Sequence, residues 1–328
     1  MALSDLSLED LEKLDVVLQE PDDLDDFWSR TLSAADAHPL DVRRQPVVTH
    51  LTTLRHEDFS FAGYGGDRIN GWLVLPATAT GPLPVVVEFV GYGGGRGLPH
   101  DRLTWASAGY AHLVVDTRGQ GAAWGSGGST ADPVGSDVST PGFMTRGILD
   151  KDTYYYRRVF TDAVRAVQAA RSLPEVRDDA VCVAGASQGG AIALAAGSLA
   201  PDVRAVMADV PFLSWFRRAL QIAPVEPYTE VVRYLSVHRD HVDRVLTTLD
   251  YFDVAHLVPR AGAPALISLA LMDRVCPPST VWAAYRRYGG PAELSVFPFN
   301  DHEGGQVHQW RRQLEWLSAL LTAPEATA

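Results

Sequence analysis

The chain has 328 residues, of which 46% are hydrophobic and 21% charged, a composition typical of a globular protein with a sizeable core. Its formal net charge of −12 argues against nucleic acid as a partner, because a phosphate backbone is bound by clustered Lys and Arg. Cys182 and Cys276 are too few for a disulfide framework and lack metal-ligand spacing, so both are expected to be free thiols, with Cys182 as a packing residue.

The N-terminal segment carries acids rather than the basic region and apolar core of a signal peptide. No apolar run approaches the roughly 18 residues of a membrane span. We therefore expect a cytoplasmic protein without a membrane partner. Within residues 1–45, acids alternate with Leu, Val, Phe and Trp, which predicts an N-terminal extension of short amphipathic helices.

From Glu57 onward, short β-rich runs bounded by Gly, Pro or Asn predict strands, which later alternate with helical stretches. We count eight such strands, which predicts an α/β fold with a mostly parallel sheet, a small antiparallel start and flanking helices. Residues 211–257 interrupt the alternation after the sixth strand and predict a helical insertion. No repeat or linker divides the chain, so residues 1–328 are expected to form a single domain.

The run VCVAGASQGGAIALAA places Ser187 between Gly185 and Gly189 in a G-x-S-x-G pattern. This pattern is typical of a nucleophile elbow, in which a strand turns sharply into a helix and holds the serine in a strained conformation. A strand of buried type precedes Ser187 and a helix of small residues follows it. This context favours the elbow over a tight turn with an incidental serine, so Ser187 is the predicted nucleophile.

A serine nucleophile needs a base, and an imidazole base needs a carboxylate that fixes its tautomer. In elbow enzymes of this kind the order along the chain is nucleophile, acid, histidine. Asp273 and His302 each follow a predicted strand, which places them where the elbow points. Asp209 is a rival acid, because it ends the strand after the elbow helix. The non-catalytic alternatives are a turn or cap aspartate at Asp273 and a plain loop histidine at His302.

The remaining histidines are placed less favourably for catalysis. His112 falls within a predicted strand. His238 and His241 are expected one turn apart on a helix, where further metal ligands are lacking.

Acyl transfer also requires two backbone N–H donors for the oxyanion that develops in the tetrahedral intermediate. One is expected from Gln188, directly after the nucleophile. The other is expected from Tyr92, in the glycine-rich bend of PVVVEFVGYGGGRG. The bend could instead be a phosphate loop, but it matches neither G-x-G-x-x-G nor the Walker A pattern.

The motifs GYGGGRG, WASAGYAHLVVDTRGQG, GASQGG, DRVCPPST and HEGG resemble those of the acetyl xylan esterases and cephalosporin C deacetylases, carbohydrate esterase family 7 of the α/β-hydrolase superfamily. The resemblance runs from DFWSRTL through HEGG. Val90 is a departure, since the family usually has a histidine two positions before the oxyanion tyrosine. The resemblance implies a triad, two oxyanion donors and an Arg-Gly-Gln motif: Ser187, Asp273 and His302; Tyr92 and Gln188; Arg118, Gly119 and Gln120.

The family resemblance also implies an activity and an assembly. The activity is deacetylation of small esters, such as acetylated xylo-oligosaccharides and cephalosporin C, without a metal or organic cofactor. The assembly is a homohexamer. From the residues themselves, Arg118 could form a surface ion pair as readily as support the site, and we expect a structural role for Arg118 and Gln120.

Two other functions remain open at this stage. One is a hydrolase of another acyl group or bond, such as a longer-chain esterase or a peptidase. The other is a catalytically silent binding protein.

Overall fold

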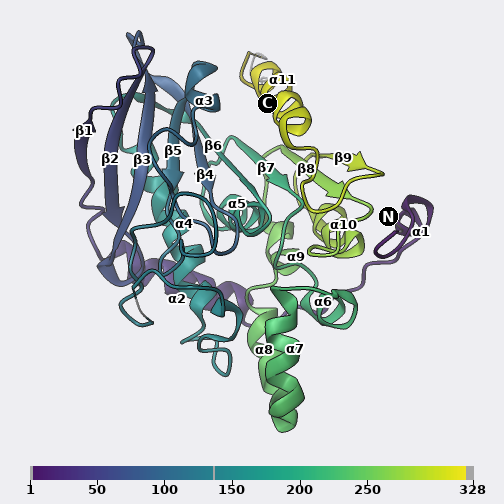
Figure 1. Ribbon diagram of the computed structural model, residues 1–328. Coiled ribbons are helices and arrows are strands. Elements are labelled where there is room, and N and C mark those ends of the chain that lie inside the picture. The colour runs from purple at the N-terminus through teal and green to yellow at the C-terminus, as the bar shows by residue number, and fades with distance from the viewer. Residues whose placement is uncertain (1–2, 136, 323–328) are drawn as a thin grey trace.

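The computed structural model describes residues 3–135 and 137–322, so the outer ends of the predicted domain lie outside the described residues. Its centre is a nine-stranded sheet with the order β1-β2-β3-β5-β4-β6-β7-β8-β9 (Figure 1). The pairs β1–β2, β2–β3 and β3–β5 are antiparallel and the others parallel, which confirms the predicted strand directions. The strands are β1 (Arg43–Val47), β2 (Leu54–Ala62), β3 (Arg68–Pro76), β4 (Leu83–Phe89), β5 (Ala111–Val115), β6 (Val176–Ala186), β7 (Ala205–Asp209), β8 (Ala265–Ala270) and β9 (Ala292–Phe297).

The predicted count of eight strands is wrong by one, because the edge strand β1 was missed. Its sequence, RRQPV, has two arginines and a proline and no apolar alternation. An edge strand tolerates charged side chains, and it tolerates proline because a backbone N–H on its open side has no neighbouring strand to bind. β1 begins at Arg43, inside the segment predicted as a helical extension, so the helical part of that extension ends earlier, with α2.

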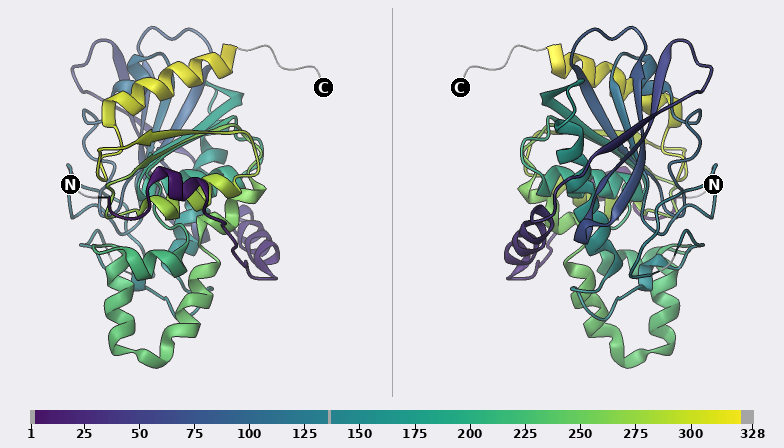
Figure 2. Two further views of the ribbon diagram at one scale, coloured as in Figure 1. Left: turned by 90° about the vertical axis from the view of Figure 1, so that its right-hand side faces the viewer. Right: turned by 90° about the vertical axis from the view of Figure 1, so that its left-hand side faces the viewer.

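Helices cover both faces of the sheet (Figure 2). Val85 and Val87 of β4 point into a core shared with α4 and α5, whereas Val86 points to the other face, where it joins Trp105 of α3 and Leu317 of α11. Helix α5 is apolar all round because it lies within the larger core. The helices outside the insertion are α1 (Leu8–Glu12), α2 (Leu24–Asp36), α3 (Thr104–Ser107), α4 (Tyr155–Arg171), α5 (Gln188–Leu199), α10 (Pro278–Arg287) and α11 (Gln306–Thr322), with short 3₁₀ turns η1 (Tyr64–Gly66), η2 (Phe143–Thr145) and η4 (Val258–Arg260).

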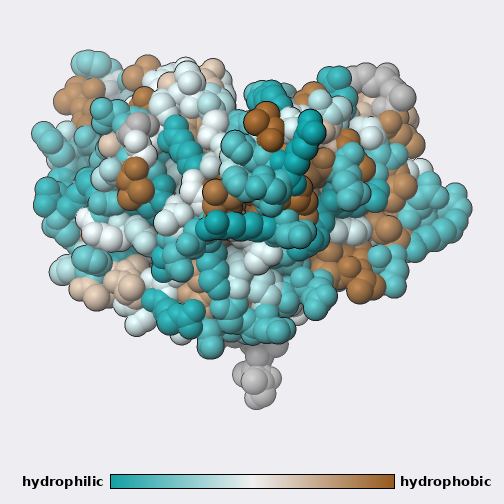
Figure 3. Space-filling model, turned by 90° about the horizontal axis from the view of Figure 1, so that it is seen from below, coloured by the Kyte–Doolittle hydropathy of each residue, from teal (hydrophilic) through white to brown (hydrophobic). Residues whose placement is uncertain are grey.

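The segment between β7 and β8 is helical, as predicted, although with nine strands it follows the seventh rather than the sixth. Two of its helices form a hairpin that projects from the body of the molecule (Figure 1). On the face seen in Figure 3, hydrophobic residues form small groups separated by hydrophilic ones. No helix in the described ranges is long and apolar enough to cross a membrane. The helices of the segment are α6 (Phe216–Ile222), α7 (Tyr228–Val237), η3 (Arg239–His241), α8 (Val242–Asp250) and α9 (Val254–Leu257).

The prediction of His238 and His241 on one helix is wrong. Residue His238 ends α7 with non-helical backbone angles, and His241 caps the start of α8. Their rings stack with centroids 5.0 Å apart. Tyr234 Oη lies 2.8 Å from His241 Nδ1, so this histidine pair is part of the packing at the tip of the hairpin.

Arg118 lies in the turn after β5 and is fully buried. The alternative considered from the sequence, an ion pair on the surface, is therefore wrong. Its Nε and Nη2 donate to the two carboxylate oxygens of Asp162 on α4, at 2.6 and 2.8 Å. Its Nη1 lies 2.9 Å from Asp67, at the start of β3. The next residue, Gly119, has φ 69°, which suits glycine. The arginine therefore joins three segments that are distant in the sequence.

We expect Arg118→Met to lower the free energy of unfolding by about 3–5 kcal/mol, because it leaves the buried Asp162 carboxylate without its cation. Urea denaturation measures this loss. Arg177→Met is the matched control: Arg177 pairs with Asp179, and both side chains are about half exposed, so the loss should stay below about 1 kcal/mol. Equal losses of unfolding free energy in the two variants would contradict the view that the Arg118–Asp162 pair matters because it is buried.

Candidate active site

Ser187 occupies the sharp turn between β6 and α5. Its backbone angles, φ 57° and ψ −120°, lie in a region that residues with a side chain adopt only under strain. The flanking glycines are sterically required. A Cβ on Gly185 would lie 2.3 Å from backbone atoms of Gly189, and a Cβ on Gly189 would lie 2.1 Å from the carbonyl oxygen of Phe89. The G-x-S-x-G pattern thus reflects how closely helix and strands approach at this turn.

Asp273 and His302 lie in the loops that follow β8 and β9. His302 Nδ1 is 2.8 Å from Asp273 Oδ2. The other carboxylate oxygen accepts backbone N–H groups from Val275 and Cys276, at 2.8 and 2.9 Å. These bonds fix the buried carboxylate, which in turn orients the ring so that Nε2 is available on its other side.

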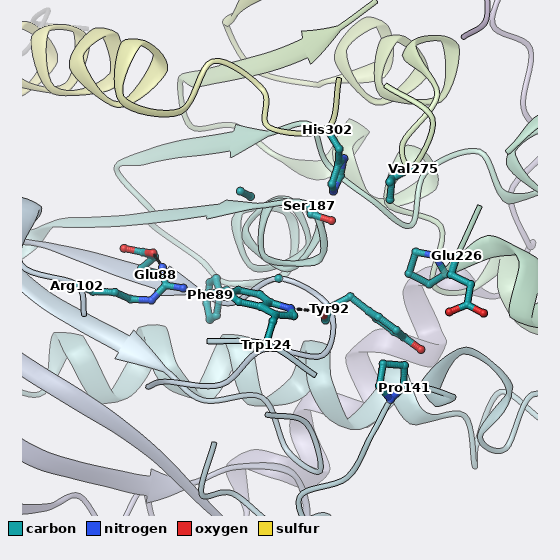
Figure 4. Close-up of a pocket in the computed structure, with 13 residues that line it drawn as sticks. Glu88, Phe89, Tyr92, Arg102, Trp124, Pro141, Ser187, Glu226, Val275 and His302 are labelled. Carbon is teal, nitrogen blue, oxygen red and sulfur yellow. Dashed lines mark hydrogen bonds and ion pairs between the residues drawn. The ribbon is translucent and has the colours of Figure 1, made fainter. Parts of the chain in front are cut away.

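Ser187 and His302 line the same cavity, which has a volume of about 410 Å³. In Figure 4 the His302 side chain points toward Ser187, while Tyr92 and Trp124 lie on the opposite side. The nucleophile and base predicted from the sequence are therefore brought together at the carboxyl ends of parallel strands. Other lining residues are Phe89, Pro141, Ala186, Glu226, Pro227 and Val275.

The two segments predicted to supply oxyanion donors meet beside this cavity. Gln188 is the first residue of α5, and N–H groups in the first turn of a helix have no partner within the helix. Tyr92 lies in the bend after β4. Gln120 connects the two segments: its Oε1 accepts the Gly93 N–H at 2.7 Å, and its Nε2 donates to Gln188 Oε1 at 2.8 Å. The backbone carbonyl of Val90 accepts a hydrogen bond from the Gln188 side-chain amide at 3.2 Å. At position 90, therefore, the backbone and not the side chain makes the contact with Gln188.

Glu230 of α7 was not identified from the sequence, yet it anchors the bend that contains Tyr92. Tyr92 Oη lies 2.8 Å from each carboxylate oxygen of Glu230 and accepts the Phe143 N–H at 2.8 Å. Met144 N–H donates to the same carboxylate at 3.2 Å. Burial raises the pKa of Glu230. A single acid on an amphipathic helix normally indicates a solvent-exposed position, so no sequence signal could have revealed this contact.

Two further groups of residues line the cavity. Trp124 is 48% exposed, and its Nε1 donates to the carbonyl of Tyr92 at 2.7 Å. Glu88, which also lines the cavity, pairs with Arg102 and, at 2.9 Å, with Nε2 of His112. Burial opposes ionisation of Glu88, but these two partners outweigh it and lower its pKa to about 2.

The rival acid, Asp209, forms its hydrogen bonds with residues other than His302. Its carboxylate accepts hydrogen bonds from the Ser268 hydroxyl at 3.1 Å and the Gln313 amide at 2.9 Å. It is Asp273 that contacts His302, so the geometry favours Asp273 as the acid.

Both cysteines are free and buried, as expected, but they lie in different surroundings. Cys182 packs in the core of β6. Cys276 lies in the loop that carries Asp273, and its N–H donates to Asp273 Oδ1 at 2.9 Å. Burial raises the pKa of the Cys276 thiol well above its ordinary value, so it remains protonated and does not compete as a nucleophile.

Comparison with known proteins supports the fold and shows the family. A sequence model of the acetyl xylan esterase family matches residues 1–320. Acetyl xylan esterases from Paenibacillus sp. R4 and Thermoanaerobacterium sp. JW/SL YS485 are 34% and 30% identical, with TM-scores of 0.89 and 0.88. The alignments cover 96% and 97% of this chain and 99% and 100% of those chains. The predicted α/β-hydrolase fold is thereby confirmed.

A curated relative is longer than this chain. Acetyl esterase Axe7A of Xylanibacter ruminicola is 29% identical over 301 residues, which make up 89% of this chain. The match spans 65% of that protein's length.

The Tyr92–Glu230 contact predicts coupled losses of activity. We expect Tyr92→Phe and Glu230→Gln each to lower kcat about tenfold with little change in KM, because the bend loses its anchor while the backbone donor at residue 92 remains. Because the two side chains act together, the double variant should lose scarcely more than either single variant. Multiplicative losses in steady-state ester hydrolysis would contradict a shared role.

Asp209 predicts a pH dependence of stability. Burial raises its pKa from 3.8 to about 7, so the folded chain binds this proton more tightly than the unfolded chain. Stability should therefore fall as pH rises from about 4 to 7, by about 4 kcal/mol at most for this group. Asp209→Asn should reduce the difference in unfolding free energy between pH 5 and pH 8, measured in urea. An unchanged difference would argue against this assignment.

Proposed function

Because the chain belongs to the acetyl xylan esterase family, we propose that it is a serine esterase that removes acetyl groups from small esters through an acetyl-enzyme on Ser187. The observation that carries this proposal is the Asp273–His302 hydrogen bond at the cavity that Ser187 also lines. The proposal requires Ser187 and His302 to contact the reacting atoms and Asp273 to orient His302.

In the first half of the proposed reaction, Ser187 Oγ attacks the acetyl carbonyl carbon while His302 Nε2 takes the hydroxyl proton. Asp273 stabilises the imidazolium that forms. The oxyanion is stabilised by the backbone N–H groups of Tyr92 and Gln188. When the tetrahedral intermediate collapses, the alcohol leaves with the proton from His302.

In the second half, a water molecule attacks the acetyl-enzyme. His302 takes a proton from the water, and the same two N–H groups stabilise the second oxyanion. Collapse releases acetate and returns the proton to Ser187. The proton and charge balance of both halves requires no group other than those named.

Several finer features of the proposal rest on the family resemblance. These are membership of carbohydrate esterase family 7, acetylated xylo-oligosaccharides and cephalosporin C as substrates, and a homohexameric assembly. A cytoplasmic location is proposed as well, from the composition of the sequence and not from the family. The cavity volume of about 410 Å³ is compatible with small substrates. The proposed assembly can be tested by measuring the molar mass in solution.

Hydrolysis of p-nitrophenyl acetate, butyrate and octanoate by the purified protein tests the proposed activity. We expect a steep fall in kcat/KM beyond acetate. Ser187→Ala should lose activity by about 10⁴-fold or more, because it removes the nucleophile. Asp273→Asn should lose roughly 10⁴-fold, because the amide no longer holds the productive tautomer of His302. Asp209→Asn is the control and should retain activity within about tenfold.

The alternatives give different results in the same assay. Equal or better hydrolysis of octanoate, still abolished by Ser187→Ala, would favour a longer-chain esterase. Cleavage of peptide but not ester substrates would favour a peptidase. No hydrolysis and no labelling of Ser187 by a phosphonofluoridate would favour a silent binding protein.

A further inference from the structure

Three groups that bind thiophilic metal ions meet beside Ser187. A nitrogen of His302, Sγ of Cys276 and a carboxylate oxygen of Asp273 all lie within 4.8 Å of one another. Asp273 and Cys276 are 0% and 1% exposed, whereas the His302 side chain is 29% exposed. Since His302 lines the cavity, an ion can approach the cluster from solvent.

The cluster is held in place by the hydrogen bonds already described. The Cys276 N–H donates to Asp273 Oδ1 at 2.9 Å, while Asp273 Oδ2 is 2.8 Å from His302 Nδ1.

The spacing of these atoms is close to that of a zinc site. Zn²⁺ binds nitrogen, oxygen and sulfur at about 2.0–2.3 Å, which puts tetrahedral ligands about 3.5 Å apart. A contraction of about 1 Å in the widest separation therefore suffices. The sulfur favours Zn²⁺, Co²⁺ and similar ions over Mg²⁺ and Ca²⁺, which prefer oxygen ligands.

We propose that the cluster of Asp273, Cys276 and His302 is an inhibitory site for Zn²⁺ and similar thiophilic cations. The ion binds the sulfur as thiolate, and the thiol proton passes to solvent. A bound ion takes His302 out of proton transfer, so ester hydrolysis stops until the ion is removed. Inhibition rests on the proposed function, whereas metal binding does not.

Cobalt spectroscopy tests binding without using activity. Added to the metal-free protein, Co²⁺ should give a thiolate-to-cobalt charge-transfer band. The band should persist in Cys182→Ser, which changes the other buried thiol, and vanish in Cys276→Ser. The proposal is overturned if the unmodified protein gives no such band or if Cys276→Ser retains it.

Inhibition is tested by titrating Zn²⁺ into the ester assay, with each variant compared with its own activity before metal is added. We expect inhibition of the unmodified protein and of Cys182→Ser, recovery on adding EDTA, and no effect of equal Mg²⁺. Half-inhibition of Cys276→Ser should need at least tenfold more Zn²⁺. Equal sensitivity of Cys276→Ser, or activity unaffected by Zn²⁺ in a protein that shows the cobalt band, would overturn the inhibitory role.

The two readouts separate this proposal from the proposed function. If the protein gives the cobalt band but hydrolyses no ester, the metal site stands and the esterase proposal fails. If it hydrolyses esters and gives no band, the esterase proposal stands and the metal site fails.

Discussion

The close approach of helix α5 to strands β4 and β6 is the constraint on which the site depends. At Gly185 and Gly189 a single added carbon atom would lie within 2.3 Å of backbone. With the helix that close, the chain between them has room only for a turn that gives Ser187 a positive φ. The strain is offset by the large apolar core that surrounds α5, and it holds the hydroxyl at the cavity instead of in the core.

Around this turn, buried polar side chains fix loops that the sheet alone would leave free. Gln120 joins the bend after β4 to the start of α5. Glu230 joins the same bend to the helical insertion. Asp273 fixes its own loop through two backbone N–H groups and orients His302. These bonds are buried or partly buried, which strengthens them and makes the loss of one partner costly. The reactive groups are therefore positioned before any substrate arrives.

The same arrangement exposes the site to metal ions. A reactive histidine must keep one nitrogen available, and the loop that carries its aspartate also carries Cys276. The hydrogen bonds that orient the histidine for proton transfer also hold it close to Cys276. A smaller hydroxyl in place of the thiol would remove the soft ligand without disturbing the backbone N–H that binds Asp273. Sensitivity to thiophilic ions is thus a property of one side chain rather than of the triad itself.

The sequence determined the features that arise from local patterns. Apolar runs predicted the parallel strands, and G-x-S-x-G predicted the strained turn, because both patterns follow from sterics within a few residues. Position after a predicted strand and order along the chain pointed to Asp273 and His302, with Asp209 left open as a rival acid. The sequence did not reveal β1, since an edge strand with Arg and Pro lacks apolar alternation. Nor did it reveal Glu230, whose partner Tyr92 lies 138 residues away, or that Cys276 lies close to His302, which is in the loop after β9. Such contacts depend on which segments the folded chain brings together, and a buried polar side chain carries no local pattern that tells it from an exposed one. The tertiary structure therefore decided which carboxylate orients the histidine, that Arg118 is buried, and which side chains anchor the loops of the site.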